Sequence, residues 1–257
     1  MPVAKRRHPL YLRLTKPIEP LYPDAVTPVA WDEDCPVDKV EGVAYLVTKP
    51  CPKLRTWAKQ LRKLHRADET YKTEDRISRI SAAPVAAGSL RHIGQVDSAI
   101  YDEDYSKIRS VRAGVHAHLQ TTFLAVILDR ADGDAVGFVS FDLKWSVDAA
   151  LDSKDEVLLE VEPDQAWITP EHRGKRWGEM AAIAIAFAAK KQADALSRAG
   201  RWPRGFHAPL KICVGADIYS TSGETFLRLC AEYVSIQFEL TDCGRLEMTE
   251  IEFEPRW

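Results

Sequence analysis

The sequence predicts an α/β protein, and two observations carry that prediction. Three stretches rich in β-branched and aromatic residues follow one another over residues 121–129, 135–147 and 155–169, as expected of paired strands. A long alanine-rich segment follows them and has no polar residue from Met180 to Ala189, which favours a helix buried against a sheet. An order in which strands alternate with helices is typical of α/β folds.

The N-terminal region is irregular. Prolines are spread from Pro2 to Pro36, which excludes a long helix and favours an extended arm. We therefore divide the chain into a proline-rich extension, residues 1–41, and one domain over residues 42–257.

The individual elements follow from periodicity and turn residues. Asp132-Gly133 between two apolar runs is a hairpin signal, and Pro163 predicts a bulge or break because proline cannot donate to a strand ladder. Strands are expected over residues 42–49, 121–129, 135–147, 155–169, 208–218, 235–240 and 245–254, and helices over 52–66, 102–119, 177–198 and 222–234.

Composition narrows the classes of function. The net charge of −3 over 257 residues provides no global attraction to nucleic acid or to an anionic membrane. The five cysteines are odd in number and form no C-x-x-C pair, which favours reduced thiols in a cytoplasmic protein and predicts no metal site. The longest apolar run is too short to cross a bilayer, so we expect no membrane partner.

The clearest functional signal lies between the strand that ends at Ile168 and the alanine-rich helix. The basic turn there reads Arg173-Gly174-Lys175-Arg176-Trp177-Gly178. The first N–H groups of a helix have no intrahelical partner, and glycines let an anion approach them closely. The turn favours phosphate binding, although a helix start with surface arginines has the same composition.

The turn and the element order together resemble the GNAT N-acetyltransferase superfamily over about residues 121–253. In the family signature Q/R-x-x-G-x-G/A, Arg173 fills the first position and Gly178 the last, whereas Arg176 replaces a glycine. The resemblance implies a mixed central sheet of about six or seven strands with flanking helices. It also implies that acetyl-CoA or another acyl-CoA binds, with its pyrophosphate on residues 173–178 and with Arg176 turned outward or touching a phosphate. The pantetheine arm would then pair with the backbone of Gln165, Ala166, Trp167 and Ile168.

The resemblance further implies candidate catalytic residues. Some members place a glutamate base eleven positions before the signature, which is Glu162 here, on one strand face with Glu160 and Asp164. The tyrosine that serves many members as general acid falls on Leu229. The remaining candidates for that role are Tyr219 and Tyr233.

The leading prediction is an N-acyltransferase that moves an acetyl group from acetyl-CoA to a primary amine by direct attack. The alternative is a non-catalytic CoA-binding regulatory or interaction module, which Arg176 and the missing tyrosine favour. A nucleic-acid role, based on Lys5-Arg6-Arg7 and a basic helix face over residues 52–66, is disfavoured by the acidic net charge. The acyl acceptor stays open, and a homodimer is compatible with the sequence.

Overall fold

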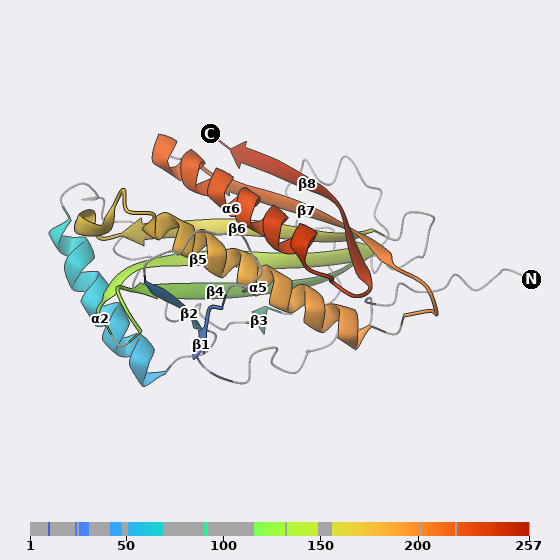
Figure 1. Ribbon diagram of the computed structural model, residues 1–257, viewed down its shortest axis with the longest axis horizontal. Coiled ribbons are helices and arrows are strands. Elements are labelled where there is room, and N and C mark those ends of the chain that lie inside the picture. Colours follow the sequence, from blue (N-terminus) through green and yellow to red (C-terminus); the bar gives the residue numbers. More distant parts are fainter. Residues whose placement is uncertain are drawn as a thin grey trace, which may run out of the picture.

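The chain has an α/β fold, in which helices lie on both faces of a sheet of parallel and antiparallel strands (Figure 1). This confirms the predicted fold class. The computed structural model describes residues 10, 24, 26–30, 42–47, 51–68, 90–91, 116–131, 133–148, 156–200, 202–218 and 220–256.

The strands of the sheet lie in the order β1-β2-β4-β5-β6-β7-β8, and the short β3 pairs with β4. Neighbours from β1 to β6 are antiparallel, whereas β6, β7 and β8 are parallel. The bounds are β1 Val26–Pro28, β2 Val43–Val47, β3 Leu90–Arg91, β4 His116–Leu128, β5 Ala135–Asp148, β6 Val157–Ile168, β7 Ala208–Asp217 and β8 Leu246–Arg256.

In the described part of the chain, three α-helices cover the sheet: α2 (Pro52–Ala67), α5 (Trp177–Ala199) and α6 (Thr221–Leu240). The two parallel connections, β6 to β7 and β7 to β8, each need a crossover, and α5 and α6 supply them on one face. Alternation along β4 separates two cores: residues 123, 125 and 127 pack on the α5 side, and residues 124, 126 and 128 pack with α2.

Two predicted elements are wrong. Residues 235–240 continue α6 and form no strand, because Tyr233, Val234, Gln237 and Phe238 repeat at helical spacing and are buried. The predicted helix over residues 102–119 is wrong at its end, since β4 begins at His116 and pairs with β5 from there. The rest of that predicted helix lies outside the described residues.

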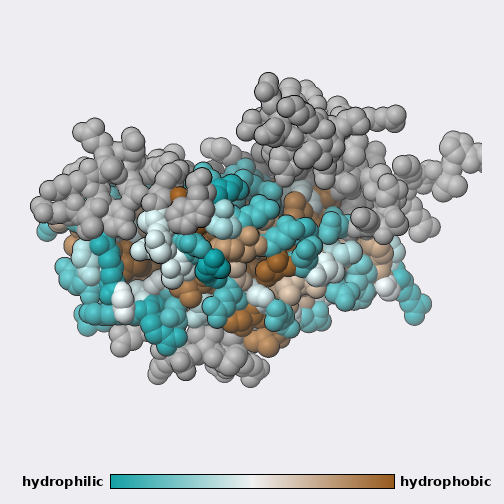
Figure 2. Space-filling model, turned by 90° about the horizontal axis from the view of Figure 1, so that it is seen from above, coloured by the Kyte–Doolittle hydropathy of each residue, from teal (hydrophilic) through white to brown (hydrophobic). Residues whose placement is uncertain are grey.

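The surface of the described part is mixed in character. Viewed from above, brown hydrophobic residues form patches between teal hydrophilic ones (Figure 2). Among the described residues, the large hydrophobic side chain that is exposed is Leu240, at 58%. Within the same part of the chain, no helix is both long and apolar enough to cross a membrane.

Candidate functional site

The parallel strands β6 and β7 separate before β6 ends. Their pairing runs from Val157–Leu210 to Val161–Val214, and β6 then continues to Ile168 without pairing to β7. A register shift against β5 leaves Asp164 as an extra residue beside Pro163, which confirms the predicted bulge. The opening lies at the carboxyl ends of parallel strands, where α/β sheets bind ligands.

The free edge of β6 offers backbone hydrogen-bonding groups to that opening. Thr169 donates its N–H to the Val136 carbonyl of β5 at 2.8 Å. In an antiparallel pair, the backbone N–H and C=O groups of every second residue bond to the partner strand. The backbone of Trp167 therefore bonds to β5, and the backbone groups of Ala166 and Ile168 point away from β5. The Ala166 N–H and C=O and the Ile168 N–H therefore face the side where β7 has left the sheet.

The turn after β6 has an unusual backbone. It follows a 3₁₀ turn, η2 (Pro170–His172), and two of its residues are left-handed, Gly174 (φ 71°) and Arg176 (φ 63°, ψ 8°). Arg176 is the N-cap of α5, and it adopts at the signature's glycine position a conformation that glycine favours.

This backbone leaves amide groups open at the start of α5. The N–H groups of four residues have no acceptor within the described part of the chain: Gly174, Lys175, Trp177 and Gly178. A Cβ added at Gly178 would meet only Phe226, at 4.0 Å, so the approach to this helix start is open. Such a start binds anions through its N–H groups and the helix dipole.

The side chain of Arg176 is held along the first turn of α5. Its guanidinium makes two hydrogen bonds to Glu179, at 2.8 and 2.7 Å. Glu179 also accepts a 2.7 Å bond from the Tyr233 hydroxyl of α6. Arg176, and after it Tyr233, lower the pKa of Glu179, and burial together with Glu179 raises the pKa of Tyr233 to about 12.

The side chain of Arg173 is directed back into the protein. Its Nε donates to the Ile168 carbonyl at 3.0 Å, and its terminal nitrogen pairs with the buried Asp68, which follows α2. The backbone N–H of Arg173 donates to Pro170 at 3.3 Å. The first residue of the signature thus fixes the turn through its side chain.

Glu162 is the first residue of β6 beyond its pairing with β7. Its carboxylate pairs with Lys144 of β5 and lies 3.6 Å from the Arg256 guanidinium of β8. Burial lowers the pKa of Lys144, but the bond to Glu162 and the surrounding acids outweigh it and raise the pKa overall. The predicted base thus lies at the point where the two strands part, and its side chain is 28% exposed.

Two other acids lie near Glu162. Burial raises the pKa of Glu160, and Lys144 opposes that shift. Asp164 accepts a 3.2 Å bond from the Ser140 hydroxyl of β5. Lys144, which pairs with Glu162, lies four residues after Ser140 on β5, and residues at even spacing point to the same face of a strand. Glu162 and Asp164 therefore contact the same face of the sheet, as the sequence predicted.

The structure describes one of the two candidate general acids. Tyr219 lies outside the described residues. Tyr233 is buried against the first turn of α5, and Leu229, where the family has its tyrosine, packs against the core. Complete burial raises the pKa of the Cys230 thiol, which keeps it protonated and argues against a nucleophilic role.

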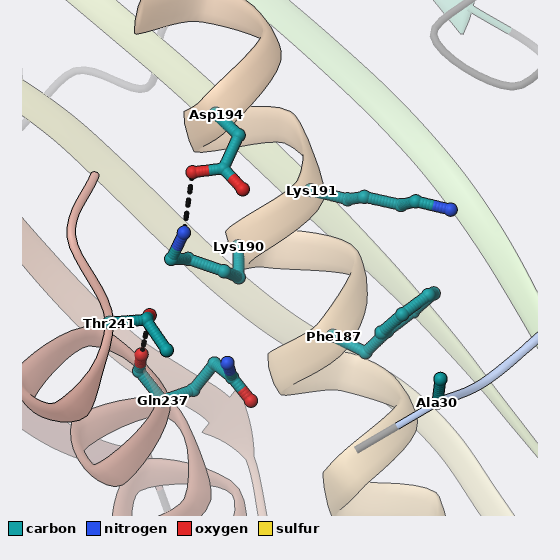
Figure 3. Close-up of a pocket in the computed structure, with 7 residues that line it drawn as sticks. All are labelled: Ala30, Phe187, Lys190, Lys191, Asp194, Gln237 and Thr241. Atoms are coloured by element: carbon teal, nitrogen blue, oxygen red, sulfur yellow. Dashed lines mark hydrogen bonds and ion pairs between the residues drawn. The ribbon is translucent and has the colours of Figure 1, made fainter. Parts of the chain in front are cut away.

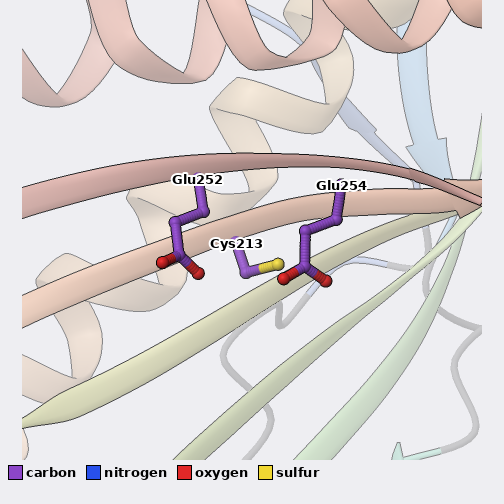
Figure 4. A group of neighbouring side chains, drawn as sticks. All are labelled: Cys213, Glu252 and Glu254. Carbon is purple, nitrogen blue, oxygen red and sulfur yellow. The ribbon is translucent and has the colours of Figure 1, made fainter.

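Three donor atoms elsewhere on the sheet lie close enough to hold a metal. Cys213 of β7 and Glu252 and Glu254 of β8 place their donor atoms within 4.8 Å of one another (Figure 4). Burial and Glu254 raise the pKa of Cys213 to about 12, and Lys211 already pairs with Glu252 at 2.5 Å. Because the Glu252 carboxylate is already paired with Lys211, we assign no metal to this cluster.

A pocket of about 290 Å³ lies between α5 and α6, far along both helices from the turn. Lys190 pairs with Asp194 at 2.5 Å, and Thr241 bonds to the Gln237 carbonyl (Figure 3). Its lining includes none of the predicted site residues.

No family model, curated protein or solved structure matches this chain. The site therefore rests on its own geometry. Sequence reasoning missed four residues that contact the predicted ones: Asp68, Lys144 and Arg256 from other elements, and Glu179 from the first turn of α5. Only Glu179 had a local signal, since it lies three residues after Arg176 on a helix.

Proposed function

We propose that this protein is an acyl-CoA-dependent N-acyltransferase that moves an acetyl group from acetyl-CoA to a primary amine. The observation that carries the proposal is the early separation of β6 from β7, followed directly by the open N–H groups at the start of α5. These two features lie in succession along the chain, as a long ligand with an amide arm and a pyrophosphate requires.

Two parts of CoA, the pantetheine arm and the pyrophosphate, have a matching surface. Its pantetheine arm contains amides that pair with the Ala166 N–H and C=O and the Ile168 N–H, as an added strand would. Its pyrophosphate accepts hydrogen bonds from the N–H groups of Gly174, Lys175, Trp177 and Gly178. Backbone groups do this binding, so it is compatible with the ion pairs that hold the side chains of Arg173 and Arg176 to Asp68 and Glu179.

The acyl transfer needs one proton to leave the amine and one to reach the sulfur. The amine nitrogen attacks the thioester carbonyl carbon, the carbon–sulfur bond breaks, and the thiolate of CoA departs. Glu162 accepts the amine proton, directly or through a water, because its carboxylate lies where the strands part. Tyr219 and Tyr233 are the two candidates for protonating the thiolate, and Tyr233 keeps its proton since its pKa is raised to about 12.

The second candidate function is a CoA-binding module without catalysis. It is favoured by Leu229 at the tyrosine position and by the engagement of the Tyr233 hydroxyl with Glu179. Both functions require CoA to bind, and only the first requires turnover.

Calorimetric titration with acetyl-CoA and CoA tests the shared requirement, and a panel of primary amines then tests turnover. Gly178→Glu should weaken CoA binding more than tenfold, because it brings a negative charge to the phosphates. Gly178→Gln is the matched control of the same shape. Both have space at this position, and Glu suits a helix start, so Gly178→Glu should fold at least as well.

Wild-type protein that binds neither acetyl-CoA nor CoA would remove both functions. Equal CoA affinity in the Glu and Gln variants would place the phosphates elsewhere. Binding without turnover of any amine would favour the module.

A further inference from the structure

An ion pair with a buried carboxylate joins the end of α2 to the turn. Asp68 has a side chain only 1% exposed, and its carboxylate receives hydrogen bonds from the Trp167 indole N–H, at 3.0 Å, and from the Arg173 guanidinium. The same guanidinium donates through Nε to the Ile168 carbonyl. One carboxylate thus contacts the indole of Trp167 on β6 and the first residue of the turn, whose Nε in turn contacts the free edge of β6 at the Ile168 carbonyl.

Asp68 is itself held in place from the other side. It is the C-cap of α2, and its backbone N–H donates to Leu64 at 3.1 Å and His65 at 3.2 Å. Helix α2 in turn packs on the sheet through a core that contains Trp167. The carboxylate therefore has little freedom to follow the turn if the turn moves.

A buried carboxylate is costly unless it is paired and hydrogen-bonded, and Asp68 meets both conditions. The pair also satisfies the Ile168 carbonyl, which alternation directs away from β5. Arg173 is thereby kept from the phosphate position, which leaves the backbone N–H groups as the anion-binding surface.

We propose that Asp68 is a positioning residue of the acyl-CoA site, which fixes the distance between the β6 edge and the N–H groups of the turn. This inference rests on the proposed function, since CoA has to contact both surfaces at once. A shift of about 1 Å between two parts of a site costs up to about a hundredfold in activity. We therefore expect the KM for acyl-CoA to depend on Asp68, and the KM for the amine to be independent of it.

Asp68→Asn tests the inference because it keeps the shape and removes the charge. We expect CoA affinity to fall at least tenfold and the KM for acyl-CoA to rise equally, with the KM for the amine unchanged. Amide hydrogen exchange over residues 166–178 should become faster. Asp194→Asn is the matched control, because it makes the same chemical change in the Lys190 pair of α5.

A double-mutant cycle separates positioning from general destabilisation. Asp68→Asn and Arg173→Gln should each weaken CoA binding, and the double variant should be no worse than the weaker-binding single, since both break one pair. If Asp68→Asn fails to fold, Trp167→Phe removes the indole N–H and leaves a smaller ring in the core, and it should speed exchange in the turn by a smaller factor.

Asp68→Asn with wild-type CoA affinity, or additive losses in the double variant, would overturn the inference while the proposed function stands. If wild-type protein binds no CoA, the proposed function fails, and a positioning role in that site fails with it. Hydrogen exchange still reports in that case whether Asp68 holds the turn: unchanged exchange over residues 166–178 would refute the physical link as well.

Discussion

Arg176 offers the sharpest test of the backbone conformation of the turn. It has a positive φ although it is not a glycine, and no other non-glycine residue in the described part of the chain does. Replacing it with glycine and with alanine separates two contributions. Both changes remove the ion pair with Glu179, whereas only glycine removes the cost of the left-handed backbone.

The difference between the two variants is therefore a backbone quantity. A residue with a Cβ pays roughly 1–2 kcal/mol in the left-handed region, and glycine loses roughly 0.5–1 kcal/mol more entropy on folding. Arg176→Gly should be more stable than Arg176→Ala by about 0.5–1 kcal/mol. The lost pair should cost both variants no more than about 1 kcal/mol, since the Arg176 side chain is 46% exposed.

Urea denaturation followed by tryptophan fluorescence measures this difference, and calorimetry measures CoA binding by the same variants. Lys175 is the matched control, because its φ is not positive and the order should reverse there, with alanine more stable than glycine. An alanine variant at 176 as stable as the glycine variant would show that the backbone is not left-handed. Weaker CoA binding by Arg176→Gly would show that the guanidinium itself contacts the ligand.

Two further variants test the candidate catalytic residues. Glu162→Gln should lower turnover at pH 7 by at least about a hundredfold, and CoA affinity should stay unchanged. The loss of turnover should become smaller as pH rises. Near-normal activity, or an equal loss in Glu160→Gln, would show that Glu162 is not the base. Tyr233→Phe should keep turnover well within a hundredfold of wild type, because the hydroxyl bonds to Glu179; a larger loss in stopped assays would make Tyr233 the acid. The raised pKa of Tyr233 means that its hydroxyl contributes stability below pH 10, which is lost as pH rises toward about 12. Wild-type stability should therefore fall more steeply than that of Tyr233→Phe over this range in pH-dependent urea melts.

The order and type of most elements were predictable because they depend on neighbouring residues. The period-two pattern of residues 121–168 and the helical spacing after Trp177 set the strands β4 to β6 and the helix α5. Pro163 marked the bulge for the same local reason, since it lacks an N–H. One error fell at residues 235–240, where a short apolar run fits either period and where packing of Gln237 and Phe238 on the core favours helix.

The turn was recognisable from the sequence, but its backbone conformation and its side-chain partners were not. Local sequence identified residues 173–178 as a basic, glycine-containing helix start. It did not indicate that Arg176 adopts glycine's conformation, nor that Arg173 turns back to pair with Asp68, the C-cap of α2. Those outcomes depend on Glu179, Tyr233 and Asp68, whose positions relative to the turn are fixed by helix packing.

The sequence by itself therefore determined most of the elements, the basic glycine-containing turn and the acidic face that contains Glu162. Only the tertiary structure decided that β6 leaves β7 after Val161, that Glu162 meets cations from two other strands, and that Asp68 reaches Arg173 across 105 residues of chain. Backbone conformation is governed by each residue and its neighbours, so it can be read locally. Side-chain partners and the end of a strand pairing are set when distant segments pack together, and no short stretch of sequence contains that information.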